Sequence, residues 1–185
     1  SEMCIRDRFT TGGGGPVEGP LLLKALYEVG YQGQRVSHLV TSPGAMEKVI
    51  SLDMVEGMIT AMTGSELEKV PPVSQELVDA YVAAYGVWDY PIILNSLTWS
   101  AMIAGLEKAQ SLDPDKVAAV IGNGMKFESP HAPGTMISRP DMGNSRTVDA
   151  IYDTYIGIIE KGGITQIATI PAETSIKYVR KAYGE

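Results

Sequence analysis

The chain is poor in the residues that form disulfides and metal sites. Among its 185 residues there are one cysteine, Cys4, and two histidines, His38 and His131. A single cysteine excludes an internal disulfide and a cysteine-based zinc site. The two histidines are far apart in the sequence and leave little material for a histidine-based metal site or a Ser-His-Asp triad. We therefore expect no metal and no cofactor.

The sequence also lacks an excess of basic residues and a long apolar run. Its 15 lysines and arginines face 22 aspartates and glutamates, which gives a net charge of -7. This balance argues against nucleic-acid binding, because phosphate recognition depends on clustered Lys and Arg. The longest stretch without a charged residue, Tyr90 to Leu106, contains polar side chains and is shorter than the ~20 apolar residues that span a bilayer. The length suits one large domain or one and a half, at roughly 100–200 residues per domain.

The first eight residues, Ser1 to Arg8, have neither apolar periodicity nor a helix cap. They resemble a translated sequencing adaptor of the kind found at the ends of assembled contigs, so we leave them out of the fold prediction. Cys4 then drops out of the native sequence. We expect the reading frame to be truncated, with the true N-terminus and any signal peptide outside this sequence.

Apolar periodicity predicts alternating helices and strands in the first third of the chain. Leu22, Leu23, Leu26 and Val29 recur at helical spacing before Gly30. The expected elements are a glycine-rich turn region at residues 9–16, a helix at 17–29, a strand at 34–41, a short helix at 44–50 and a strand at 57–62. This order predicts a parallel sheet covered by helices, the α/β class.

The rest of the chain has clear helix starts. Asp113 precedes Pro114, which predicts an aspartate N-cap followed by proline at the first helical position. Ser74 is expected to cap a helix at 75–85 that ends at Gly86. The other expected elements are a linker at 64–72, helices at 91–110, 114–121 and 172–183, a strand at 135–138, and a hairpin of 151–159 and 164–170 around a four-residue loop at 160–163.

No group of residues assembles a convincing active site. The run Gly12–Gly15 precedes a helix, but it lacks the lysine and hydroxyl of a phosphate loop and the spacing of a dinucleotide fingerprint. The carboxylate pairs Glu66/Glu68 and Asp113/Asp115 are interpreted as solvated or capping groups. We expect His131 in a surface turn. The face with Trp99 and Met102 is interpreted as core, although Trp99 could also line a pocket.

Three segments carry a resemblance to a known family, the type I periplasmic binding proteins, which are the substrate-binding subunits of branched-chain amino-acid-type ABC transporters. The segment from Trp99 to Ile121 resembles the family's helix pair around Glu-Lys-Ala and Asp-Pro. The segment from Pro20 to Gly33, with Val55-Glu-Gly57 after it, resembles a helix and strand start of the second lobe. The third, Phe127 to Ile137, resembles a family hairpin. The segments agree in order and spacing from Phe9 to about Ile170.

The resemblance implies two α/β lobes joined by crossing strands, with the ligand in the cleft between them. It implies that residues 9–70 belong to the second lobe, residues 71–140 to a returning part of the first lobe, and residues 141–185 to a crossing back and a C-terminal helix. Most of the first lobe would then precede this sequence, so the fold would be incomplete.

The resemblance also implies ligand contacts. The family's second lobe touches the ligand through two loops, which correspond here to Gly13, Gly14 and Gly15 and to Thr41, Ser42 and Pro43. Asn95 and Trp99, at the start of the long helix, correspond to the side of the hinge that faces the cleft; packing of that helix is the alternative for Trp99. Amino-acid binders place an aromatic residue and an acid in these loops, and this chain has neither. A pocket without a carboxylate leaves a ligand ammonium unpaired, which argues against an α-amino acid.

The implied function is the binding subunit of an ABC importer, without catalysis. It would take a small polar solute (an amino acid, amide or small carboxylate) by closing the cleft, and would dock on a membrane permease from an extracytoplasmic or periplasmic location. Contact with the membrane would come through the permease or through a lipid anchor in the missing N-terminus. Two alternatives stay open: a ligand-sensing domain of the same fold, and a Rossmann-type nucleotide-dependent enzyme that uses Gly12–Gly15.

Overall fold

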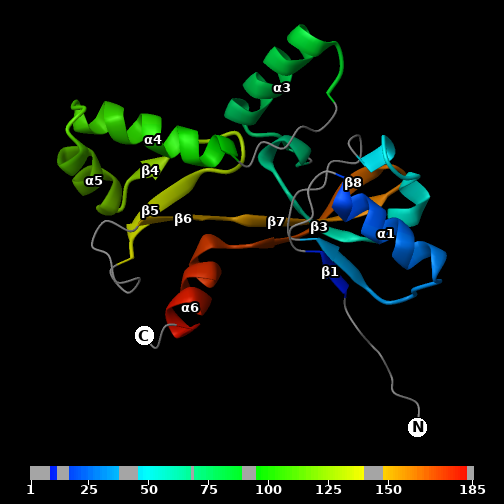
Figure 1. The fold of residues 1–185 in the computed structure, drawn as a ribbon. Coiled ribbons are helices and arrows are strands. Elements are labelled where there is room, and N and C mark those ends of the chain that lie inside the picture. Colours follow the sequence, from blue (N-terminus) through cyan, green and yellow to red (C-terminus); the bar gives the residue numbers. More distant parts are fainter. Residues whose placement is uncertain are drawn as a thin grey trace.

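The chain folds into two groups of elements, each built around its own sheet (Figure 1). The computed structural model describes residues 9–11, 17–37, 46–67, 69–88, 95–139 and 148–182. The α/β class predicted from the sequence is confirmed. No helix among the described residues is long and apolar enough to cross a membrane.

The first group contains a five-stranded sheet in the order β1-β2-β3-β7-β8. Its first three strands, β1 (Phe9–Thr11), β2 (Arg35–Ser37) and β3 (Ile59–Met62), are parallel, as predicted. An antiparallel hairpin of β7 (Thr154–Glu160) and β8 (Gly163–Ile170) completes the sheet beside β3. The prediction of a turn region was wrong for residues 9–11, because pairing with β2 makes them a strand.

Helix α1 (Glu18–Glu28) and the short helix η1 (Leu52–Val55) pack beside this sheet. Gly30 follows α1 with a φ of 71°, which glycine adopts more readily than other residues, so the helix ends where the sequence predicted. The apolar residues that close the core come from α1, from the segment after β2, and from β7: Leu23, Met46, Ile50, Val55, Met58 and Ile159.

The second group consists of a helix pair and a three-stranded antiparallel sheet. Its elements are α4 (Asn95–Ala109), α5 (Pro114–Gly122), β4 (Lys126–Phe127), β5 (Gly134–Ser138) and β6 (Val148–Tyr152). Gly105 lets the two helices approach closely, since a Cβ there would lie 2.7 Å from Ile121 Cγ1. Asp113 accepts hydrogen bonds from the N–H groups of Asp115 and Lys116, so the predicted N-cap is confirmed.

Helix α3 (Pro72–Tyr85) lies between the two groups in the chain and ends at Gly86, whose φ is 86°. Ser74 is not its cap, contrary to the prediction. The helix begins at Pro72, and the buried Ser74 hydroxyl donates to the carbonyl oxygen of Pro130 at 2.9 Å. A contact with a distant segment therefore replaces the local capping bond that the sequence suggested.

Within the described residues, the chain passes between the groups at three crossings. The first is η2 (Gly64–Glu66), between β3 and α3. The second is Asp153, where β6 gives way to β7, and these two strands form one long run across Figure 1. The third is Pro171, before α6 (Ala172–Ala182), which contacts β6 of the second group. The Asp153 carboxylate accepts the N–H of Ala172 at 2.8 Å, which ties the second crossing to the third.

Two details of the predicted hairpin were wrong. The run 151–159 is not one strand, because Tyr152 pairs with Gly134 in one sheet and Thr154 pairs with Ile170 in the other. The connecting turn has two residues rather than four, since Glu160 pairs with Gly163. Lys161 and Gly162 take φ values of 52° and 79°, as the two central residues of a type I′ hairpin turn do.

Candidate functional site

The carboxyl ends of β1 and β2 lie side by side, because Thr11 pairs with Ser37 in the parallel register. Ser37 in turn pairs with Thr60 on β3, and both of these residues are buried. Ligands of parallel α/β sheets bind at this edge. The predicted contacts Gly13, Gly14, Gly15, Thr41, Ser42 and Pro43 lie outside the described residues; in the sequence they come after β1 and β2, which are adjacent strands.

The other two predicted contacts lie on α4, in the second group. Asn95 is the first residue of the helix, and Trp99 follows one turn later with 65% of its surface exposed. The prediction that the Trp99 face belongs to the core was wrong for these residues, because Leu97 and Ala101 on the opposite side of α4 pack into the core. The described residues thus leave most of the Trp99 side chain uncovered, and a ligand could reach it.

A hollow of about 520 Å³ lies beside α4 and is mainly apolar. It is lined by Leu97, Thr98, Ala101, Met102, Ile121, Met136, Ala150 and Tyr152. Its lining has no charged side chain. It extends the core of the second group and does not offer the convergent polar groups that orient a small polar ligand.

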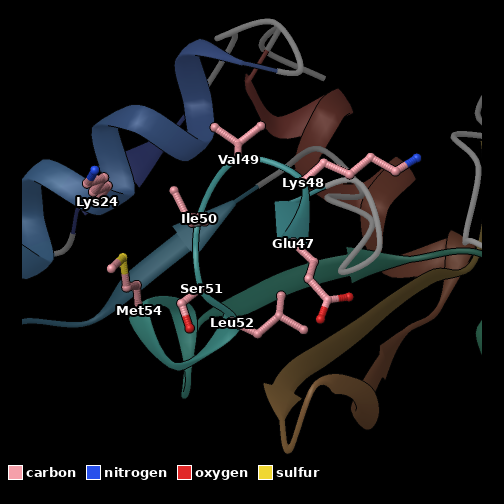
Figure 2. Close-up of a pocket in the computed structure, with 8 residues that line it drawn as sticks. All are labelled: Lys24, Glu47, Lys48, Val49, Ile50, Ser51, Leu52 and Met54. Atoms are coloured by element: carbon pink, nitrogen blue, oxygen red, sulfur yellow. The ribbon is translucent and has the colours of Figure 1, made fainter.

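A second hollow, of about 430 Å³, lies between α1 and the segment that follows β2. Lys24 contributes from α1, and residues 47–52 and Met54 form the rest of the lining (Figure 2). Figure 2 shows that the charged ends of Lys24, Glu47 and Lys48 point in different directions. The lining includes Ile50, a buried residue of the core of the first group, so we interpret this hollow as the rim of that core.

The first crossing contains a partly buried acid, Glu66, for which the sequence analysis left a solvated and a capping role open. The Glu66 carboxylate accepts the N–H of Thr63 at 2.7 Å, which confirms the capping role of Glu66; Glu68 lies outside the described residues. Burial raises the pKa of Glu66 to about 7, although the hydrogen bonds from Thr63 oppose the shift. The carboxyl group is therefore partly protonated near neutral pH.

His131 lies beside this crossing, and the prediction of a surface position was wrong. Only 5% of its surface is exposed. The Ser129 hydroxyl donates to the carbonyl of Ala132 at 2.7 Å and accepts the N–H of Ala132 at 3.1 Å, which closes a buried turn around His131. Its ring packs edge-on against Tyr152 at 5.0 Å, and burial lowers its pKa.

Sequence reasoning missed the contacts of this crossing because they join segments more than fifty residues apart. One signal was present in the sequence. Thr63 and Glu66 have the Ser/Thr-x-x-Glu spacing of a capping box, which marks an ordered turn rather than a flexible linker. In the described ranges no three His, Cys, Asp or Glu side chains form a group that could hold a metal ion.

Comparison with known proteins identifies a family and a fold. The family model described as "Periplasmic binding protein" matches residues 10–152. No curated protein matches the chain. Among solved structures, the leucine-binding protein LivK of Thermotoga maritima is 22% identical with a TM-score of 0.63, and the match covers 90% of this chain and 44% of that one.

Two further structures show the same fold at lower identity. One is the closed form of a binding protein for leucine, isoleucine, valine, threonine and alanine from Brucella ovis, with 16% identity, a TM-score of 0.66, and coverage of 91% of this chain and 44% of that one. The other is an ABC transporter solute-binding protein from Rhodopseudomonas palustris in complex with benzoate, with 14% identity, a TM-score of 0.62, and coverage of 90% and 45%. The chain thus spans less than half of each of these proteins.

Proposed function

The chain belongs to the periplasmic binding protein family, and we propose that the protein of which it is part is the solute-binding subunit of an ABC importer. The family match over residues 10–152 carries this proposal. In this reading, the first group of elements belongs to the second lobe and the second group belongs to the first lobe. The solute lies between them, the protein is periplasmic, and its partner is a membrane permease.

The mechanism we propose is closure of the two lobes about the three crossings. Three separate connections can act as a hinge, because small changes of backbone angle at a few residues at the ends of elements turn one lobe relative to the other. The solute would bind the closed form better and so shift the equilibrium toward it. No covalent chemistry is part of this function.

The proposed solute is a small polar molecule, and its class follows from the residues that come after β1 and β2 in the sequence. Gly13–Gly15 and Thr41–Pro43 offer backbone N–H groups and hydroxyls but no carboxylate. Such groups suit an anionic or amide oxygen better than an ammonium, whose charge would stay unpaired in a closed cleft. The benzoate complex of a protein with this fold agrees with a carboxylate solute. Trp99 would cover the apolar part of the solute.

A thermal-shift screen of the full-length protein tests the proposal. The panel contains benzoate, short aliphatic carboxylates, their amides, leucine and valine, with a nicotinamide nucleotide as the probe for an enzyme. A solute at about 100 times its Kd adds about 2.7 kcal/mol to the stability of the folded state. We expect carboxylates or amides to raise Tm more than the amino acids do. No shift with any solute, or a shift with the nucleotide alone, would contradict the proposal.

A further inference from the structure

The first crossing is held to the second group by two hydrogen bonds to one buried turn. The Gly64 N–H donates to the carbonyl of His131 at 2.8 Å, and the Ser74 hydroxyl donates to the carbonyl of Pro130. Both carbonyls belong to the turn Ser129–Ala132. We call the turn, Gly64 and Ser74 together the crossing clamp. The clamp joins β3 and α3 to the second group at a point where the lobes would have to move.

The side chain of His131, a residue of this turn, is buried. The ring packs on Tyr152, the residue before the second crossing. The backbone carbonyl of His131 accepts the N–H of Gly64 in the first crossing, so this one residue contacts both crossings. The ring nitrogen Nδ1 is buried and has no hydrogen-bond partner among the described residues. A neutral imidazole accepts this environment, whereas an imidazolium needs partners for both of its N–H groups.

Among the described residues no charge offsets the burial of the ring. The elements joined to the His131 turn carry Tyr152 and Asp149 on β6, Glu66 in η2, and Glu76, Asp79, Tyr81 and Tyr85 on α3; Asp153 follows β6, and Lys126 and Glu128 precede His131 on its own segment. Glu76, Asp79, Glu128 and Lys126 are exposed, and desolvation is the cause that lowers the pKa of His131. A proton on His131 would therefore be buried without a partner.

We propose that the crossing clamp is a pH-sensitive element, which holds the first crossing in place while His131 is neutral and loosens when His131 takes up a proton. In the proposed function, the clamp would regulate the closure of the lobes. When the clamp loosens, the first crossing gains conformational freedom that closure must remove. This entropy cost weakens solute binding at acid pH. The consequence for binding rests on the proposed function; the loosening itself does not.

Hydrogen exchange of the Gly64 amide in the solute-free full-length protein tests the clamp directly. All variants carry Glu66→Gln, because Glu66 titrates in a pH range that overlaps with that of His131. The protein with this one change is the parent, and it is compared with the variant that also carries His131→Phe. Phenylalanine keeps an apolar ring against Tyr152 and cannot be protonated. His38→Phe controls for the other histidine of this chain, and Ser74→Ala removes one clamp bond without a titrating group.

Protection of Gly64, corrected for intrinsic exchange, should fall by up to about tenfold per pH unit below pH 6.5 while His131 is present. The protection should not change with pH in His131→Phe, and in His38→Phe it should fall as it does in the parent. In Ser74→Ala the protection should be lower at every pH, but its slope against pH should equal that of the parent. Equal slopes with and without His131 would overturn the proposal. If His131→Phe does not fold, an NMR titration decides: an imidazole pKa of 6.5 or more in the folded protein contradicts the clamp.

Solute affinity separates this inference from the proposed function. With the solute found in the screen, the ratio of Kd at pH 5 to Kd at pH 7.5 should be larger with His131 than with His131→Phe. If no solute binds, the proposed function fails, while the exchange measurement still decides on the clamp. If solute binds and the exchange slopes are equal, the clamp fails alone.

Discussion

At the scale of single residues, Gly64 shows how one missing side chain shapes a crossing. A Cβ at this position would lie 2.6 Å from Ser74 Oγ and 2.9 Å from the carbonyl oxygen of Pro130. The carbonyl is backbone in a tight turn and cannot swing away as the end of a long side chain does. Glycine is required here for close approach, which adds a steric reason to the hydrogen bond that its N–H makes.

Gly64→Ala should therefore lower the free energy of unfolding by about 1–3 kcal/mol, the usual cost of overpacking. Gly163→Ala is the matched control, because the nearest atom to its added Cβ, the carbonyl oxygen of Glu160, is 3.8 Å away. Urea unfolding of the full-length proteins at pH 7.5 measures both. Equal stability of the two variants would mean that the crossing is not packed as described.

Glu66 should make stability depend on pH in the opposite sense to His131. Its pKa is about 7 in the folded protein against 4.5 unfolded, so the folded state holds the proton more tightly. The stabilisation is fully present below pH 4.5 and is lost as pH rises to about 7, on the order of 3 kcal/mol in all. Glu66→Gln keeps an oxygen acceptor for the Thr63 N–H and should remove this slope.

Unfolding free energies at pH 5 and pH 7.5 give the comparison for Glu66. It is made in a His131→Phe background, so that the titration of His131, beside the first crossing, does not overlap with that of Glu66. A parent slope that survives in Glu66→Gln would show that the carboxyl group is solvated, not buried.

At the scale of elements, helix α5 depends on its first residues. Asp113 satisfies two N–H groups of the first turn, at 2.9 Å from Asp115 N and 3.4 Å from Lys116 N. Asp113→Ala should lower stability by about 1 kcal/mol, and Asp113→Asn should restore most of it, because asparagine caps nearly as well. Thermal unfolding of the two variants checks the order. A loss of the same size in both would assign the effect to charge rather than to capping.

The elements also show which parts of the fold are readable in the sequence. The cap at Asp113 and the end at Gly86 were predicted because their causes are local: a side-chain acceptor and a φ that glycine tolerates. The strand at Phe9–Thr11 was not, because its pairing with Arg35–Ser37 lies beyond any short window. The break at Asp153 was missed for the same reason, since the two sides of this residue pair with different strands.

The candidate site divides in the same way. The resemblance gave Asn95 and Trp99, and the structure shows where both lie on α4, with Trp99 exposed. The six loop residues remain a prediction from the family. His131 was misjudged because proline and serine neighbours are typical of surface turns, and the contact with Tyr152 that buries it joins two strands of the fold.

At the scale of the whole molecule, the described residues form two groups of elements that are joined by three crossings. Each group has its own sheet and its own buried apolar cluster. Separate cores make each group a body that can move as a unit, and the crossings are the segments that would bend. This arrangement agrees with the family assignment and with our proposal that solute binding closes a cleft.

Small-angle X-ray scattering of the full-length protein, with and without a solute that raises its Tm, tests that claim most directly. Lobe closure should lower the radius of gyration on saturation, and the change should follow the binding isotherm. A compound of the panel that does not raise Tm should leave the curve unchanged. If the radius of gyration stays the same at saturation with a solute that stabilises the protein, binding does not close the lobes, and the account is contradicted.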